Sequence, residues 1–173
     1  IRWLAYGIET GSEQIRKEVM KGSFTNKKIK EVIKMTKDND ICIIGNFMCG
    51  FWQDNLDTMQ QTLDLALDLQ CEFVNFYCVS AFPNTKFYEE MKERKIELPT
   101  KWSQYAQMSE DFMPLSTNFL KKEEVLTFRD KAFKTYFENY EYQKMIKDKF
   151  NWKVLNDITK MLSYRIKRKI LCQ

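Results

Sequence analysis

The sequence predicts an α/β fold: a partial (half) parallel βα barrel over residues 1–98, followed by a helical C-terminal extension over residues 99–173. Three short apolar runs, rich in β-branched or aromatic residues, have the composition of strands that are buried on both faces of a parallel sheet. Helically spaced segments separate them, so one strand and one helix repeat every roughly 30–40 residues, the size of a βαβ unit. Beyond Leu98 the alternation stops.

The three predicted strands are Trp3–Ile8, Ile41–Met48 and Phe73–Ser80. After the first strand, Thr10 and Glu13 have the spacing of a capping box for a helix that ends near Gly22. A second helix is expected from Thr25 to Lys37, because apolar residues recur there at spacings of three and four.

Asp54 is expected to cap a third helix, and Pro83-Asn84-Thr85 to start a fourth that ends near Arg94. The segment Pro99–Leu120 predicts an irregular connection. Its expected anchors are Trp102, Tyr105, Phe112, Met113 and Pro114. Two apolar stripes then predict two or three further helices. The stripes are Val125, Phe128, Ala132, Phe133, Tyr136 and Phe137, and Leu155, Ile158, Leu162 and Ile166.

The composition is that of a folded domain, with 44% hydrophobic and 30% charged residues. No apolar run approaches the ~20 residues of a membrane-spanning helix, and no signal-peptide pattern is present. A cytoplasmic protein with no membrane partner is therefore expected. The first residue, Ile1, lies inside an apolar run, which favours a fragment of a longer protein.

The five cysteines have no CxxC spacing, and the sequence contains no histidine. Neither a disulfide framework nor a standard metal site is expected from this pattern. Cys42 and Cys78 lie in strand-like runs, where a free cysteine usually acts as a small buried apolar residue.

Three unusual segments follow the predicted strands. They are Tyr6–Ser12, Gly45–Phe51 and Ser80–Thr85. In a parallel barrel the chemistry gathers at this end, where glycines let a ligand approach the backbone and polar side chains orient it. Gly45 and Gly50 have the spacing of a P-loop, but Phe51 and Trp52 replace its Lys and its Ser or Thr. A nucleotide held through its phosphates is therefore disfavoured.

Three motifs, in order and at barrel spacing, resemble the fourth, fifth and sixth strands of radical S-adenosylmethionine (radical SAM) enzymes. They are Gly7-Ile8-Glu9-Thr10-Gly11-Ser12, Asn46-Phe47-Met48-Cys49-Gly50-Phe51 and Phe82-Pro83-Asn84-Thr85-Lys86-Phe87-Tyr88-Glu89. The branch that carries an N-terminal cobalamin-binding domain is the most similar. The stretch from Trp102 to Leu171 also resembles the C-terminal extension of such proteins.

The resemblance implies an enzyme in which a [4Fe-4S] cluster on a CxxxCxxC loop binds S-adenosylmethionine and cleaves it to a 5′-deoxyadenosyl radical. That radical abstracts hydrogen from a small-molecule substrate, which the sequence does not identify. Methyl transfer and the use of cobalamin stay open. The resemblance assigns S-adenosylmethionine contacts to Glu9, Thr10, Ser12, Asn46, Met48, Gly50, Phe82 and Pro83. It assigns no catalytic residue.

The chain departs from the family in lacking the three cluster cysteines and the first three strands. Alone it is expected to be inactive, and its expected partners are the missing barrel half and a cobalamin-binding domain of the same protein. Trp52 and Gln53 replace the usual Pro-Gly after the fifth strand, and Asn84 replaces the Gly usual before Thr85. The first change leaves the shape of that loop open.

Structural interpretations stand beside these roles. Glu9 can be a helix-start carboxylate, Asn46 can satisfy backbone groups, and Met48 and Phe82 can be core residues. The segment from residue 121 onward has 14 Lys and Arg against 7 Asp and Glu, and its stretch Tyr164–Lys169 reads as a solvated helix end. The alternative function is a non-catalytic helical interaction module whose basic tail binds an acidic partner or, less favoured, nucleic acid.

Overall fold

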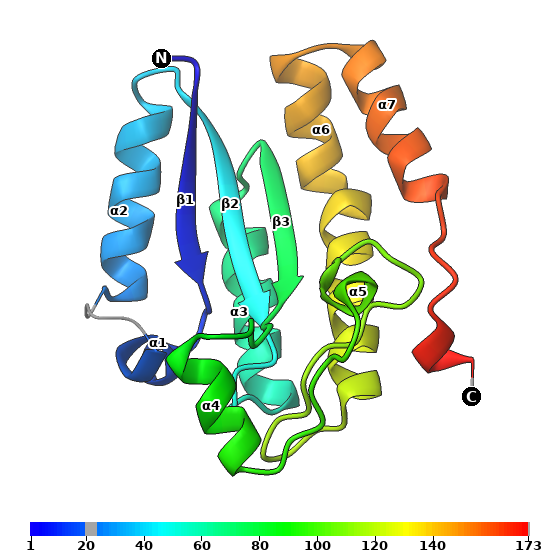
Figure 1. Ribbon diagram of the computed structural model, residues 1–173. Helices are drawn as coiled ribbons and strands as arrows, with labels where there is room; N and C mark the ends of the chain where they lie inside the picture. The colour runs from blue at the N-terminus through cyan, green and yellow to red at the C-terminus, as the bar shows by residue number, and fades with distance from the viewer. Residues whose placement is uncertain (20–23, 173) are drawn as a thin grey trace.

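A computed structural model describes residues 1–19 and 24–172 of the chain (Figure 1). Its strands are β1 (Trp3–Glu9), β2 (Cys42–Cys49) and β3 (Phe73–Cys78). Its α-helices are α1 (Glu13–Val19), α2 (Asn26–Lys37), α3 (Leu56–Leu69), α4 (Lys86–Glu93), α5 (Lys122–Glu138), α6 (Tyr140–Lys149) and α7 (Trp152–Ser163). Two short 3₁₀ turns, Trp102–Tyr105 and Lys169–Leu171, complete it. The predicted strands and helices are therefore present, and the expected end of the first helix near Gly22 lies outside the described residues.

The strands form one parallel sheet in the order β1-β2-β3. This arrangement agrees with the βα repeat predicted from the spacing of the strands, and α2 and α3 pack against β2. The structure therefore confirms an α/β fold with a partial parallel βα arrangement.

Alternation along the strands separates the two faces of the sheet. Ile43, Phe47, Val74 and Phe76 are buried in the main core together with apolar residues of α3 and α5. The residues between them, such as Ile44, Asn46 and Asn75, are only half-buried. Figure 1 shows this second face toward the viewer, with no helix drawn across it.

The two edges of the sheet differ. Helix α5 packs beside β3, and Tyr136 of α5 donates a hydrogen bond from its hydroxyl to the carbonyl of Cys71 just before that strand, at 2.6 Å. In the described part of the chain β1 pairs with β2 alone. Helix α5 contributes to the same core as the sheet. The division of the chain at residue 98 stays a prediction.

Several local expectations were wrong. Asn55, not Asp54, caps α3, and its side chain accepts from the Thr58 backbone N–H at 2.9 Å. The Glu13 carboxylate accepts from the Asn26 N–H instead of closing a capping box with Thr10. Among the expected anchors of the connection, Trp102 is 76% exposed and packs beside Tyr105, whereas Tyr105, Phe112 and Met113 are buried as predicted.

The predicted helix end at Tyr164–Lys169 was also wrong. Helix α7 ends at Ser163, and residues 164–168 form no regular structure. Ile166 therefore lies beyond the helix. Arg168 is buried, whereas its basic neighbours Arg165 and Lys167 are exposed.

Candidate functional site

The segments that follow the three strands lie at one edge of the sheet, because parallel strands share their carboxyl ends. Figure 1 shows α1 and α4 at this edge, the ends to which the strand arrows point. Gly7–Ser12 leads into α1 and Ser80–Thr85 leads into α4. The sequence prediction that these segments gather at one end is confirmed.

A row of amide side chains crosses the uncovered face near this edge. Asn46 on β2 stands in register with Gly7 on β1 and with Asn75 on β3. The Asn75 side-chain amide donates to Asn46 Oδ1 at 2.9 Å, and Asn46 Nδ2 donates to the Tyr6 carbonyl at 3.4 Å. Because both side chains are half-buried, they still present polar atoms at the face.

Glu9 adds a carboxylate to this row. The register shifts between Gly7 and Glu9, and Glu9 has a left-handed backbone with φ of 65°, which is uncommon for a residue other than glycine. A Cβ placed on Gly7 would lie 2.6 Å from Glu9 Oε1, so the carboxylate folds back over Gly7, the register partner of Asn46. Burial raises the pKa of the Glu9 carboxyl above its ordinary value.

Thr10 and Ser12 point into the protein. Both are buried, and the Thr10 hydroxyl pairs with the Thr62 hydroxyl of α3 at 3.1 Å and accepts from the Ser12 N–H at 3.1 Å. Thr62 also accepts from the Gly11 N–H at 2.9 Å. These groups hold the loop that carries Glu9, and ligand contact by Thr10 and Ser12 stays a prediction.

Gly11 is required by the packing of this loop on α3. A Cβ at Gly11 would overlap the backbone carbonyl of Gln61, and backbone cannot move aside as a flexible side chain can. The same loop is held from the other side by Arg16, a buried residue of α1. Its guanidinium donates to the carbonyls of Thr10 and Phe24 and to Asn26 Oδ1.

The loop after β2 is fixed by a buried carboxylate. Asp54 accepts from the N–H groups of Gly50 and Phe51, both at 2.9 Å, and from the Thr58 hydroxyl at 2.6 Å. Burial raises the pKa of Asp54, while these hydrogen bonds oppose the shift. Trp52 and Gln53, which replace the Pro-Gly usual in the resembled family, therefore lie in a loop whose start is held by hydrogen bonds from the backbone to Asp54.

The remaining predicted contacts lie at the same edge with different exposure. Met48 is half-buried opposite Tyr77 and packs on the small cluster that contains Ile15 and Phe51. Phe82 is 50% exposed and stacks on Tyr105 at 5.3 Å between ring centroids. Pro83 is half-buried in the same segment. A hollow shared by Glu9, Asn46 and Pro83 stays a prediction.

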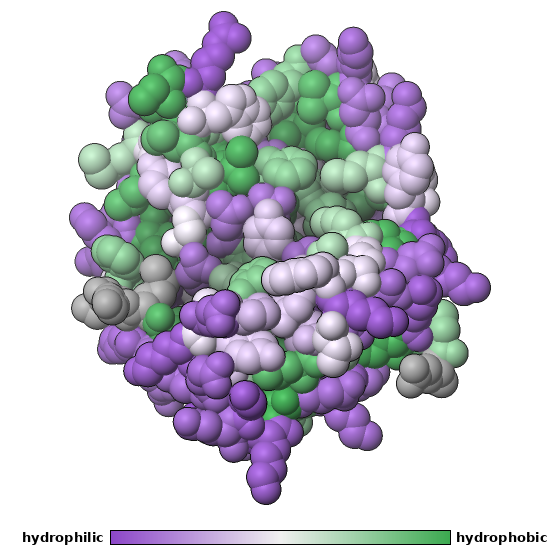
Figure 2. Space-filling model, in the orientation of Figure 1, coloured by the Kyte–Doolittle hydropathy of each residue, from purple (hydrophilic) through white to green (hydrophobic). Residues whose placement is uncertain are grey.

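Two cavities border the sheet. One of about 240 Å³ is bordered by β1, α1 and α2 and includes Gly7 and Arg16 in its wall. The other, about 350 Å³, lies toward the opposite ends of the strands, between Trp3, Phe73 and the helices α6 and α7. Figure 2 shows apolar side chains over the upper part of the molecule and a more polar surface over α1 and α4.

The described residues do not fit an iron–sulfur cluster. Within residues 1–19 and 24–172, no three Cys, His, Asp or Glu side chains come together as metal ligands. Cys42, Cys49, Cys71 and Cys78 are all buried. Burial raises the pKa of Cys71 to about 12 and that of Cys78 to about 11, so both are neutral thiols near pH 7.

The uncovered face brings a carboxylate and two amide side chains together beside a glycine, and these groups can hydrogen-bond a polar ligand. Asn75, Thr62 and Arg16 were missed by sequence reasoning. Asn75 could have been found as a polar residue inside an apolar strand, whereas the role of Thr62 depends on a partner 52 residues away.

No helix in the described part of the chain is long and apolar enough to cross a membrane.

Comparison with known proteins gives distant relatives. No protein-family model matches the chain. It is 32% identical over 91 residues to a bacteriochlorophyllide d C-12(1)-methyltransferase of Chlorobaculum tepidum, covering 53% of this chain and 20% of that protein. It is 24% identical over 100 residues to an uncharacterized methyltransferase of Pyrococcus horikoshii, covering 58% of this chain and 22% of that protein. It is 29% identical over 86 residues to a candidate methylthiotransferase of Methanocaldococcus jannaschii, covering 50% of this chain and 19% of that protein.

The chain matches about a fifth of the length of each of these relatives. The chain is therefore a distant relative of methyltransferases and of a candidate methylthiotransferase, which is consistent with a radical SAM relationship.

Proposed function

We propose that this chain forms the S-adenosylmethionine-binding rim of a radical SAM enzyme that transfers a methyl or methylthio group. The single observation that carries the proposal is the placement of Glu9 and Asn46 on the same uncovered face, at the carboxyl edge of three parallel strands. The printed activities of the distant relatives support it. Their substrates are not assigned to this chain.

In this proposal S-adenosylmethionine supplies the reactive group, and the residues of the chain bind and orient it. The Glu9 carboxylate accepts hydrogen bonds from the ammonium group or from ribose hydroxyls, and Asn46 and Asn75 offer amide donors and acceptors. Gly7 lets the ligand approach the backbone of β1, and Gly50 shapes the turn that follows β2. Met48, Phe82 and Pro83 would flank the adenine, and Thr10 and Ser12 would hold the Glu9 loop.

The proposal requires further parts of a longer protein. A [4Fe-4S] cluster would be bound outside this chain, since the described cysteines do not fit it. The edge of β1, which pairs with β2 alone among described strands, supports a further strand of the same barrel there. The proposal also includes a cobalamin-binding domain in the longer protein and a small-molecule substrate.

The test at the level of the chain uses Glu9→Gln with Glu141→Gln as its control, because Glu141 is an exposed residue of α6. Titration calorimetry with S-adenosylmethionine should show binding about tenfold weaker for Glu9→Gln, the cost of losing one charge-assisted hydrogen bond, and no change for Glu141→Gln. Equal affinity of Glu9→Gln and the unaltered chain would contradict the assigned role of Glu9.

The pH dependence has a defined sign. Since burial raises the pKa of Glu9, the carboxylate is protonated at a higher pH than an ordinary glutamate, and affinity for the cationic ligand should fall as pH drops through that raised pKa. For folding, a raised pKa in the native state means that ionised Glu9 costs stability near pH 7. Glu9→Gln should therefore melt no lower than the unaltered chain at pH 7.

The test at the level of the whole protein is anaerobic expression of the full-length parent with a reconstituted cluster. The proposal predicts 5′-deoxyadenosine or S-adenosylhomocysteine among the products. If neither forms while the cluster is intact, the proposed reaction class is wrong.

A further inference from the structure

Arg168 is buried in the most basic stretch of the chain. Its side chain is 3% exposed, although it lies between exposed lysines. A buried guanidinium is costly unless hydrogen bonds and opposite charge satisfy it, so the position must provide both. It lies in the segment after α7, far along the sequence from the sheet.

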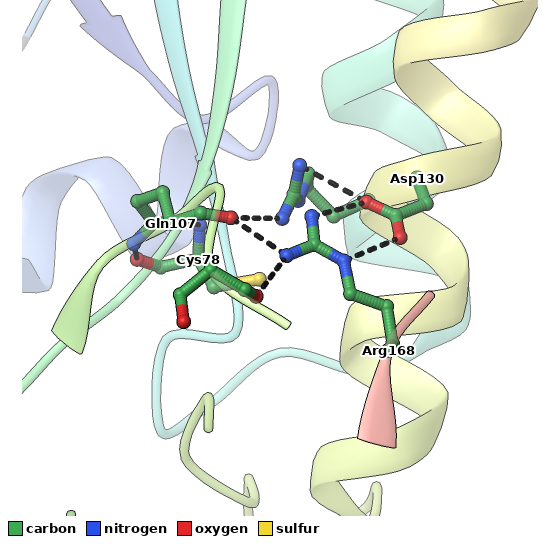
Figure 3. A network of polar contacts seen from close by, with 6 residues as sticks. Cys78, Gln107, Asp130 and Arg168 are labelled. Atoms are coloured by element: carbon green, nitrogen blue, oxygen red, sulfur yellow. Dashed lines mark hydrogen bonds and ion pairs between the residues drawn. The ribbon is translucent and has the colours of Figure 1, made fainter. Parts of the chain in front are cut away.

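The partners of Arg168 come from α5 and from the connection before it (Figure 3). Its guanidinium pairs with the Asp130 carboxylate at 3.3 and 3.4 Å and donates to the carbonyls of Gln107 at 3.0 Å and Ser109 at 2.8 Å. Arg129 also pairs with Asp130, at 3.0 Å, and donates to the same Gln107 carbonyl at 3.1 Å. Two guanidinium groups therefore hold one backbone carbonyl.

Gln107, whose carbonyl both arginines bind, is also hydrogen-bonded to the end of β3. Its side chain accepts from the Cys78 N–H at 3.0 Å and donates to the Cys78 carbonyl at 2.9 Å, so it pairs with the strand as another strand would. The same Nε2 lies 3.4 Å from the Ser80 hydroxyl. Figure 3 shows Gln107 beside Cys78, with a dashed line from Gln107 to the Arg168 guanidinium that pairs with Asp130.

The segment held in this way carries two of the proposed ligand contacts. Residues 79–85 connect β3 to α4 and include Phe82 and Pro83. Phe82 stacks on Tyr105, two residues before Gln107, so the connection supports this segment at two points. A displacement of Gln107 would therefore reach the segment through both contacts.

We infer that Arg168 is a positioning residue that fixes the segment 79–85 through Gln107 and thereby strengthens the binding of S-adenosylmethionine. The link to the ligand rests on the proposed function, whereas the link from Arg168 to the segment does not. The C-terminal tail thus acts on the binding face without touching the ligand.

The test compares Arg168→Gln, Gln107→Ala and the double variant in the full 173-residue chain. The control is Arg165→Gln, which removes the same charge from an exposed tail position. Hydrogen–deuterium exchange well below the melting temperature should be about tenfold faster at the amides of residues 79–85 in both single variants, with β1 and β2 unchanged. Arg165→Gln should leave it unchanged.

The double variant distinguishes positioning from a general loss of stability. Since both side chains act on one path, the double variant should exchange no faster in residues 79–85 than Gln107→Ala alone. Unchanged exchange in Arg168→Gln, or effects that multiply in the double variant, would overturn the inference. Should Arg168→Gln fail to fold, Gln107→Ala decides alone: unaltered exchange in residues 79–85 refutes the path.

Calorimetry with S-adenosylmethionine then tests the link to binding. Arg168→Gln should bind several-fold more weakly than Arg165→Gln, and equal affinities would overturn that link. If the unaltered chain itself fails to bind, the proposed function fails, and with it the link to binding. The exchange measurement still decides whether Arg168 positions the segment.

Discussion

Thr62, a residue in the middle of α3, fixes the loop that follows β1. Its hydroxyl accepts from the Gly11 N–H, pairs with Thr10 and donates to the Thr58 carbonyl. It is 1% exposed, so no solvent replaces these bonds when the hydroxyl is removed. The position of Glu9 thus depends on a residue that makes no contact with the uncovered face.

Thr62→Val should destabilise the chain by about 1–3 kcal/mol, because it keeps the shape of the side chain but leaves the buried Gly11 N–H without its acceptor. Thr159→Val is the control, since Thr159 donates to a carbonyl four residues earlier on the exposed side of α7. Urea denaturation measures both. Equal midpoints for the two variants would show that Thr62 does not hold the loop.

The sequence could indicate Glu9 and Asn46 because Glu9 follows one strand-like run and Asn46 lies near the end of another, where parallel sheets place polar contacts. It could not show that Thr10 faces inward, since the direction depends on Thr62 of another helix. The sequence also could not show that Arg168 is buried while its basic neighbours are exposed. Burial of that residue depends on Asp130, 38 positions earlier in the chain.

At the scale of elements, the turn from β2 to α3 depends on a glycine for two reasons. Gly50 has φ of 87°, a conformation that side chains disfavour, and a Cβ there would lie 2.7 Å from Val125 Cγ1 of α5. Asp54 binds the backbone of the same turn. The turn is therefore packed directly on the C-terminal extension.

Gly50→Ala should destabilise the chain by about 1–3 kcal/mol through backbone strain and overpacking against Val125. Gly7→Ala is a matched control, because its added methyl meets only the flexible carboxylate end of Glu9. It should leave the melting temperature nearly unchanged while weakening S-adenosylmethionine binding. A Gly50→Ala variant that melts with the unaltered chain would contradict this packing.

Elements with strong local signals could be predicted closely. Helix α2 begins after Thr25, whose side chain accepts from Lys28 N–H, and ends at Lys37, as the apolar spacing indicated. The predicted cap of α3 was wrong by one residue. Asp54 and Asn55 are both good capping residues, but Asp54 accepts a hydrogen bond from Gly50 in the preceding turn, and Asn55 caps the helix. Residues 164–168 leave the helix because Arg168 pairs with α5.

At the scale of the molecule, the sheet has one covered edge and one open edge. Helix α5 packs beside β3, while β1 pairs with β2 alone in the described chain and carries exposed residues such as Trp3 and Ala5. An unpaired strand with free backbone groups favours pairing with another chain. The isolated chain is therefore expected to self-associate through β1.

Ala5→Lys should reduce this association, because a charge on an edge strand disfavours pairing. Met35→Lys, on the exposed side of α2, is the control for the added charge. Sedimentation equilibrium at several concentrations measures the association. The expectation fails if the unaltered chain is monomeric throughout, or if both variants dissociate equally.

The most direct measurement is amide chemical-shift mapping of the ¹⁵N-labelled chain during titration with S-adenosylmethionine. Binding on the uncovered face predicts shifts at Gly7 and Glu9 and at the side-chain amides of Asn46 and Asn75, which stand in one row across the strands. Saturable shifts confined to the cavity between Trp3 and α7, or no shifts at all, would contradict a nucleoside site at the carboxyl edge of this sheet.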